Sequence, residues 1–461
     1  MQFDYNQHFI WWDWFANFSR ATFVIYFRVL ALQAIFLFLF LLLFLFDVQA
    51  EQLSRSQAEQ LWRLNNREIK IALSAITGAR GDLATADRMP NPTLSLSTTQ
   101  INTHSGIGGG GIADKTIDSV LRVEQTWERG GKRDLRASAG RARVMAAQED
   151  AVEAERQGLI QLYSAYWDLK LAFDRERLTQ SSAALARQST AASEKRLKAG
   201  DIAAVDFAKL HIDALRVETD ARSAVADRQK AQFGLAVLIG RELVAETLVC
   251  ADDWPTLAGP VPSLRDAAGV DARADVKAAS QKLAAALAVR EGAKALSARD
   301  ITVGLQFERY PPAAGFSPNN TWGISVAVPL FASSSYYRGE SMRAEADLDA
   351  ARETVERTRS FARFEQGRAL ADLQSSMERR RGLENELLPE AERVAKANEF
   401  AYLNGGISLL DLLDARRTLR QSQQDLAAVR NDHAKALVTW QLQLPQPPTL
   451  GLTPREIINE K

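Results

Sequence analysis

A long apolar run near its start is the strongest pattern in the sequence. Residues 29–46 read VLALQAIFLFLFLLLFLF, with Arg20 and Arg28 before the run and the small residues Val48 and Ala50 after it. A basic stretch, an apolar stretch and an AxA-like site in this order are typical of a secretory signal, so residues 1–50 are predicted to be a signal peptide region cleaved after Ala50. A run of this length is also nearly enough to span a bilayer as a helix, so an uncleaved inner-membrane anchor is the alternative.

Four short segments alternate between apolar and polar residues, which is the pattern of a strand with one dry and one wet face. They predict strands at about 92–101, 118–127, 300–309 and 321–330. A turn-rich loop separates the members of each pair, with four consecutive glycines in the first loop and three prolines in the second. The sequence therefore predicts two hairpins.

Long stretches with helical periodicity and few helix-breaking residues predict very long helices. The first is expected over 132–199, on the order of 100 Å at 1.5 Å per residue, and the chain then turns back into a second helix over 203–240. Corresponding helices are expected over 338–403 and 408–444, with a kink at Pro389 because proline removes a helical hydrogen bond. Gly200 and Gly405 stand at the two turns, where glycine permits the left-handed conformation that ends a helix. Shorter helical stretches, 61–87 and 263–298, precede the strand pairs.

The order of helix, two strands and two long helices occurs twice. The turn at 196–207 aligns with 401–412 at an offset of 205 residues, with Gly, Ile and Asp shared. Because a fixed offset is the signature of internal repetition, the chain is predicted to be duplicated rather than built from unlike domains. The predicted divisions are repeat 1 over 51–250, a linker over 251–262, repeat 2 over 263–445 and a C-terminal tail over 446–461.

Composition excludes several classes of protein. Lys+Arg and Asp+Glu balance at 57 each, which argues against a nucleic-acid partner. Cys250 is the single cysteine, and the four histidines show no metal-ligand spacing, so no disulfide within the chain, metal site or cofactor is predicted. No catalytic constellation is present, and an enzyme is not expected. Four strands cannot close a transmembrane barrel, because the smallest barrels have eight strands. Other copies of the chain must therefore supply the remaining strands.

With these features the chain resembles the TolC-type outer-membrane efflux proteins. The resemblance covers residues 58–445 and rests on the duplicated unit, on Gly-x-Ile-x-x-x-Asp at both turns and on Leu387-Leu388-Pro389 ahead of the second turn. The segment 124–133, EQTWERGGKR, is similar in particular to the heavy-metal (cobalt-zinc-cadmium) branch. A pair of glycines with basic residues is also simply a good junction between a strand and a helix. The residues open to both interpretations are Gly130, Gly131, Lys132 and Arg133.

This resemblance implies a mainly α fold with membrane β: a duplicated unit of long coiled-coil helices and four strands. A homotrimer would form a twelve-stranded β-barrel and a periplasmic α-helical barrel, in the outer membrane of a Gram-negative bacterium and in contact with its lipid. The implied function is a passive exit duct, expected to carry heavy-metal cations, that docks with a periplasmic membrane-fusion adaptor and an inner-membrane pump of the resistance-nodulation-division type. Multidrug or organic-solute efflux, or type I secretion, through the same fold is one alternative. An inner-membrane-anchored periplasmic coiled-coil scaffold is the other.

The resemblance also implies where the periplasmic entrance lies. Asp411 and Asp414 match positions at which family members place rings of aspartates that constrict the closed entrance. Asp206 and Tyr402 correspond to a hydrogen-bonded pair that helps to hold it shut. At the position of a latch arginine in the best-known members this chain has Ile407, so its inter-subunit latch departs from the family pattern. The residues expected at the adaptor-facing tip turns are Gly200, Ile202, Gly405 and Ile407.

Overall fold

The computed structural model describes residues 51–104, 106–111, 114–257, 269–311 and 320–444. The chain divides into two compact units, of which the smaller comprises residues 1–52 and 246–249. The larger unit, residues 53–245 and 250–461, contains the long helices and a four-stranded sheet. The predicted signal region 1–50 and the predicted tail 446–461 lie outside the described residues.

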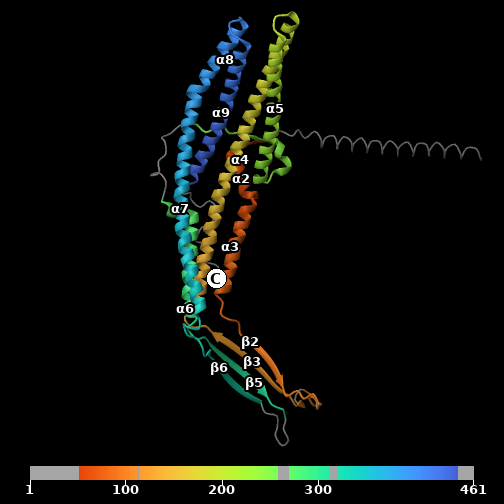
Figure 1. Ribbon diagram of the computed structural model, residues 1–461. Coiled ribbons are helices and arrows are strands. Elements are labelled where there is room, and N and C mark those ends of the chain that lie inside the picture. Colours follow the sequence, from red (N-terminus) through yellow and green to blue (C-terminus); the bar gives the residue numbers. More distant parts are fainter. Residues whose placement is uncertain (1–50, 105, 112–113, 258–268, 312–319, 445–461) are drawn as a thin grey trace, which may run out of the picture. The chain divides into compact units, whose positions relative to one another are not determined.

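A single antiparallel sheet unites the two predicted hairpins, with the strands in the order β2-β3-β5-β6 (Figure 1). Strands β3 and β5 pair in the centre, where Ser119 lies opposite Arg309 and Trp127 lies opposite Ile301. Strands β2 and β6 are therefore the two edges. The strands are β2 (Thr93–Thr99), β3 (Asp118–Trp127), β5 (Ile301–Arg309) and β6 (Asn320–Ala327).

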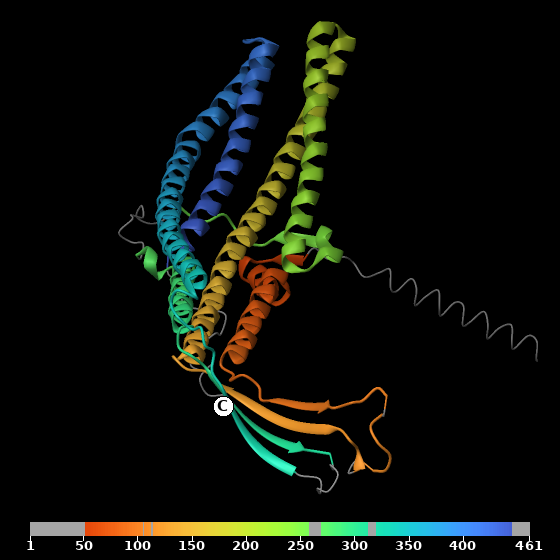
Figure 2. The same cartoon turned by 60° about the horizontal axis from the view of Figure 1, so that its bottom comes forward.

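Two long helical hairpins follow the two strand pairs along the chain. Helix α4 packs against helices of both repeats: α3 and α5 from the first, and α6 and α9 from the second. Figures 1 and 2 show the hairpins running away from the sheet within this unit. The hairpin helices are α4 (Lys132–Ala199), α5 (Ala204–Ile239), α7 (Arg338–Gly382), α8 (Leu388–Leu403) and α9 (Leu409–Gln441).

The helices before the strands differ from the expectation. The stretch predicted at 61–87 is two helices, α2 (Arg55–Asn65) and α3 (Arg67–Ala86). They separate at Asn66, whose side chain accepts a hydrogen bond from the Ile69 N–H and so caps α3. In the second repeat, residues 263–268 of the predicted helix 263–298 lie outside the described residues. The described part contains a 3-10 turn, Val270–Ala272, followed by α6 (Ala274–Ala295), which ends three residues before the predicted boundary.

The irregularity expected at Pro389 lies one turn earlier. A π-helical turn, Leu383–Leu387, connects α7 to α8, and the Leu388 N–H donates to the Leu383 carbonyl five residues before it. Pro389 stands in the first turn of α8, where its missing N–H is best tolerated. Helices α7 and α8 are therefore continuous through the wider π-helical turn, and Pro389 lies at the start of α8.

Aromatic residues fill the core in the middle of α4. Tyr166 and Trp167 are fully buried, and the Trp167 ring stacks on Trp254 at 5.4 Å. On another face of α4, a Cβ at Gly158 would lie 2.3 Å from the Trp62 ring, so α2 can pack this closely only on a glycine. Cys250 is buried here, and its Sγ lies 3.4 Å from the Tyr166 carbonyl. None of the described helices combines the length and apolar character needed to cross a membrane.

Two very short strands, β1 (Glu51–Leu53) and β4 (Leu248–Cys250), form a separate two-stranded sheet. A 3-10 helix, Glu242–Thr247, precedes β4.

Candidate functional site

One face of the four-stranded sheet is apolar and exposed. The strand register forms two neighbouring rows of apolar residues across the four strands. One row is Leu94, Val123, Leu305 and Ile324, and the row two residues further along β2 is Leu96, Leu121, Phe307 and Trp322. Leu94 is 69% exposed and Ile324 is 79% exposed. A contiguous exposed apolar face of this kind marks a surface that meets another protein or lipid.

The opposite face is polar. Arg122 donates from Nε and Nη2 to Gln306 Oε1 at 3.0 and 2.6 Å, and its Nη1 lies 3.5 Å from Glu124 Oε1. Thr126 and Thr302 form a cross-strand hydroxyl pair at 2.8 Å on the same face. A sheet with one apolar and one hydrated face suits a wall between lipid and water.

The two edges of this sheet are open in the described part of the chain. Strands β2 and β6 each pair on one side only, with β3 and β5 respectively. Unpaired backbone N–H and C=O groups along an edge are a template for another strand. The sheet of one chain is therefore an incomplete structure.

The glycine and basic residues after β3 form the junction between the sheet and the helices. Gly130 and Gly131 have φ values of +76° and +69°, and a Cβ at Gly130 would lie 2.6 Å from the Ala298 Cβ. Lys132 donates from Nζ to the Ala298 carbonyl at 2.8 Å and to both Asp300 carboxylate oxygens at 2.8 and 2.9 Å.

Two further contacts complete this junction. The Arg129 N–H donates to Asp300 Oδ1 at 3.0 Å, and Arg133 pairs with Asp87 at 3.2 Å. The basic residues therefore tie the start of α4 to the ends of α3 and α6. This geometry accounts for the Gly-Gly-Lys-Arg element as a strand-to-helix junction.

At the opposite ends of the long helices, both turn glycines adopt the expected left-handed conformation. Gly200 has φ +82° and Gly405 has φ +73°, and nothing lies within 4 Å of a Cβ built on either. Backbone conformation, and not space, therefore requires glycine at these turns. The Asp201 N–H closes the first turn on the Arg196 carbonyl at 2.9 Å, and the Gly406 N–H closes the second on the Ala401 carbonyl at 2.8 Å.

An apolar cluster joins the two tips. Leu210 of the first hairpin is buried against Leu409 and Leu412 of the second, with Tyr402 and Ile407 packed around them. Ile407 therefore fills a small core at the position where the family pattern has an arginine. Ile202, its counterpart in the first turn, is half-buried.

The two residues of the predicted latch have other partners within the chain. The Asp206 carboxylate lies 3.4 Å from Lys209 Nζ, and the Arg196 guanidinium lies 6.0 Å from the centre of the Tyr402 ring. In the described structure of a single chain, no hydrogen bond joins Asp206 to Tyr402.

Asp411 and Asp414 line one acidic groove. Asp411 Oδ2 accepts from the Ser408 N–H at 3.2 Å, and the Asp411 N–H donates to Ser408 Oγ at 3.3 Å, which forms a capping box at the start of α9. Both aspartates are exposed and face a groove of about 1150 Å³ between the α7–α8 segment and α9. The other charged residues that line it are Arg379, Glu386, Glu390, Arg417 and Asp425.

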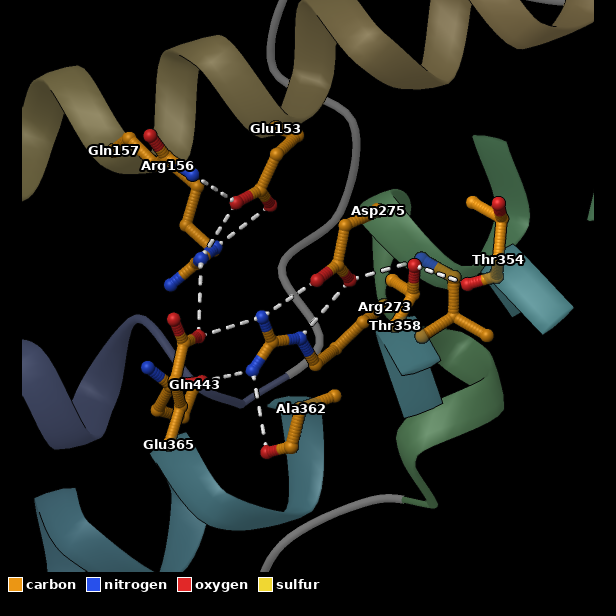
Figure 3. A network of polar contacts seen from close by, with 11 residues as sticks. Glu153, Arg156, Gln157, Arg273, Asp275, Thr354, Thr358, Ala362, Glu365 and Gln443 are labelled. Carbon is orange, nitrogen blue, oxygen red and sulfur yellow. Dashed lines mark hydrogen bonds and ion pairs between the residues drawn. The ribbon is translucent and has the colours of Figure 1, made fainter. Parts of the chain in front are cut away.

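The sequence patterns missed a buried polar network at the start of repeat 2 (Figure 3). Arg273 is 8% exposed, and its guanidinium donates to Asp275 and Glu365 at 2.8 Å and to Gln443 at 2.7 Å. Glu365 also lies 3.7 Å from Arg156 on α4. An arginine before a helix is an ordinary pattern, so only the fold reveals that it connects α6, α7 and the end of α9.

A second buried group, also missed, lies beside the π-helical turn. His433 is 2% exposed, and its Nδ1 lies 3.1 Å from Arg380 Nη1. Arg380 pairs in turn with Glu384 at 3.1 Å. Burial and the neighbouring Arg380 charge lower the pKa of His433 from 6.5 to about 4. No cluster of His, Cys, Asp and Glu in the described residues could hold a metal ion.

The amphipathic sheet and the duplicated helical hairpins suit a protein of the outer membrane whose helices extend into the periplasm, and comparisons with known proteins support this class. The family model described as "Outer membrane efflux protein" matches residues 269–442. The cobalt-zinc-cadmium resistance protein CzcC of Cupriavidus metallidurans is 24% identical over 363 residues, which are 78% of this chain and 82% of CzcC. The pyoverdine export outer membrane protein OpmQ of Pseudomonas putida is 29% identical over 219 residues, 46% of this chain and 45% of OpmQ.

A solved structure supports the same fold. The Campylobacter jejuni CmeC outer membrane channel superposes with a TM-score of 0.73 at 16% identity, covering 85% of each chain. Residues 269–442 therefore resemble the outer membrane efflux protein family, and the fold resembles that of a solved outer membrane channel. Members of this family are passive transport ducts, so the chain is not an enzyme. Its location in the outer membrane also excludes the alternative of an inner-membrane scaffold.

Proposed function

We propose that this chain is the outer-membrane channel of a tripartite efflux system, driven by an inner-membrane pump of the resistance-nodulation-division type, and that it exports heavy-metal cations. The observation that carries the proposal is the incomplete sheet: four strands with an exposed apolar face and two open edges. Three copies joined edge to edge would supply twelve strands, enough to close a barrel with its apolar face toward lipid and its polar face toward water.

The helices support the same assembly. Helix α5 exposes Val205, Ile212, Leu215, Phe233 and Val237. The spacing of the first three is that of a coiled-coil seam, and such a seam requires a partner helix. The α7–α8 segment also exposes apolar side chains, including Phe361, Phe364 and Phe400. If the apolar surface of α5 in one copy packs on that of the α7–α8 segment in the next, the interface is heterologous. Such an interface forms a ring when the rotation between copies closes.

Cation transport is supported by the charge of the groove at the tip. In a trimer, Asp411 and Asp414 would contribute six carboxylates, which attract cations and repel anions. The similarity to CzcC, a cobalt-zinc-cadmium resistance protein, favours metal cations as cargo.

The tip turns are the proposed docking surface for the periplasmic adaptor. Gly200, Ile202, Gly405 and Ile407 stand at or beside the two turns and link α4 to α5 and α8 to α9. Because Asp206 and Tyr402 are not bonded within one chain, a latch made from them would join neighbouring copies.

Recordings in planar bilayers test the channel and its entrance together. The variant Asp411→Asn/Asp414→Asn removes two charges per chain but keeps a side-chain acceptor for the capping box, so the start of α9 should remain folded. We expect a lower ratio of cation to anion permeability from the reversal potential in a salt gradient. The matched control is Glu68→Gln/Glu353→Gln, which removes two exposed carboxylates without a described partner. Unchanged permeability in the first variant would overturn the entrance role, and failure of the unaltered chain to form trimeric pores would overturn the channel itself.

Export of an organic solute through the same fold is the second candidate, favoured by the similarity to OpmQ, a pyoverdine export protein. Type I secretion is a further use of such a duct. A deletion strain separates these possibilities. Loss of tolerance to cobalt, zinc or cadmium supports metal efflux, whereas unchanged tolerance to these metals with loss of solute export supports the alternative.

A further inference from the structure

Each of the four connections between the sheet and the helices has one exposed arginine without a carboxylate partner among the described residues, either within the connection or at the first residue of the helix that follows it. The connections leave the sheet together at its helical end (Figure 2). These four residues, called here the boundary arginines, are Arg88 between α3 and β2, Arg129 between β3 and α4, Arg299 between α6 and β5, and Arg338 at the start of α7.

The other basic residues of these connections are already neutralised. Lys132 pairs with Asp300, Arg133 with Asp87, and Arg136 with Glu128 at 2.5 Å. By contrast, no ion pair of the described residues includes a boundary arginine, and Arg299 donates only to the Leu330 carbonyl at 3.3 Å. The boundary therefore holds four positive charges that form no ion pair among the described residues.

The exposed acidic residues nearby have a local role. Asp134 and Glu340 lie in the first turns of α4 and α7. A negative charge at this position interacts favourably with the positive end of the helix dipole. These two carboxylates form no ion pair with the boundary arginines.

Exposed apolar and aromatic side chains accompany the boundary arginines. Met89 follows Arg88 directly, and Trp127, two residues before Arg129, is on the apolar face of the sheet. Leu330, Phe331 and Tyr336 are exposed in the connection between β6 and α7. Aromatic side chains next to cationic ones are typical of the level where hydrocarbon gives way to headgroups.

We propose that the boundary arginines bind phosphate headgroups of the phospholipid leaflet on the helix side of the membrane, and that the neighbouring apolar side chains contact the adjoining acyl chains. A guanidinium that has no carboxylate partner can donate two parallel hydrogen bonds to phosphate oxygens. The apolar face of the sheet continues directly into this level through Trp127, so acyl chains and headgroups would meet one continuous surface. The proposal rests on the barrel orientation proposed above and adds to it a specific lipid contact.

Lipid binding to the detergent-purified trimer tests this inference. Phosphatidylglycerol would be titrated into the protein and retained lipid counted by native mass spectrometry. The test variant is Arg88→Gln/Arg129→Gln/Arg299→Gln/Arg338→Gln. The control variant, Arg216→Gln/Arg357→Gln/Arg363→Gln/Arg381→Gln, removes the same charge from exposed arginines of α5 and α7 that have no described partner.

An arginine close to an anionic lipid surface contributes about 1 kcal/mol, so each boundary substitution should weaken apparent affinity about fivefold. We expect the boundary variant to lose phosphatidylglycerol and the control variant to retain it, with single-channel conductance unchanged in both. Equal retention in the two variants would overturn the inference. So would a conductance change without lipid loss, because the arginines would then face the water-filled pore. If the unaltered chain yields neither trimers nor pores, the proposed channel fails and not the lipid contact alone.

Discussion

Replacing Lys132 with methionine tests whether the basic junction after β3 is a structural element. The Lys132 side chain is 11% exposed, and its ammonium is bonded to Asp300 and to the Ala298 carbonyl. Methionine has a similar length but no charge, so Asp300 would keep only the bond from the Arg129 N–H. The substitution therefore removes one set of contacts while leaving the packing volume nearly intact.

The expected loss follows from this geometry. A hydrogen bond to a charged group contributes about 1.5–3 kcal/mol when one partner is removed. Asp300 is 29% exposed, and water can therefore replace part of the lost interaction. We expect Lys132→Met to lower the free energy of unfolding by about 2 kcal/mol. Lys198→Met is the control, because Lys198 pairs with Glu194 at a mostly exposed site of the same helix, where solvent screening leaves such a pair little effect on stability.

The assay is chemical denaturation of the detergent-purified protein, followed by far-ultraviolet circular dichroism. A double-mutant cycle with Asp300→Asn isolates the interaction between the two side chains. Cation selectivity in planar bilayers should stay unchanged, since the ammonium is enclosed in the junction. Two results would refute the structural role: equal stability of the Lys132 and Lys198 variants, or changed selectivity without any loss of stability.

Two further predictions concern the buried groups that the sequence patterns missed. Arg273→Ala should destabilise the protein by about 3 kcal/mol because it leaves buried polar partners unpaired. The control Arg359→Ala breaks more exposed pairs, with Asp271 in the 3-10 turn before α6 and with Glu356 on α7, and should destabilise the protein much less. Denaturation curves of the two variants measure the difference, and equal losses would contradict it. The folded state holds the pKa of His433 near 4 and an unfolded histidine has a pKa of 6.5, so the unfolded state binds more protons between these pH values. The free energy of unfolding should therefore fall by at most about 3 kcal/mol as the pH drops from 6.5 to 4. His433→Gln should flatten this pH dependence, and an identical slope in the variant would contradict the assignment.

Local features of the sequence were enough to predict the class of fold. Alternation with period two identified the strands because successive side chains of a strand point to opposite faces. Gly200 and Gly405 marked the helix turns, since their φ values of +82° and +73° favour glycine. The 205-residue offset established the duplication before any contact was known. These signals are readable because each depends on neighbouring residues along the chain.

The roles of individual site residues needed the tertiary structure. Ile407 is a departure from a family pattern in the sequence, but in space it fills an apolar core with Leu210 and Leu409. Lys132 is part of a motif that suits either a branch of the family or a junction, and only its contact with Asp300 accounts for its position. The family resemblance implies a pair of Asp206 with Tyr402, whereas within the chain Asp206 lies beside Lys209 and Tyr402 lies beside Arg196.

Local patterns along the chain encode the periodicity, the turns and the repeat, whereas the packing of the elements sets which distant residues meet. Arg273 and Gln443 are 170 residues apart in the chain and 2.7 Å apart in space, and no local propensity encodes such a pair. The same holds for the open edges of the sheet, because the strand pattern predicts four strands but not that β3 and β5 occupy the centre. Conformational preference is a property of short segments, whereas burial and charge pairing depend on how the segments pack.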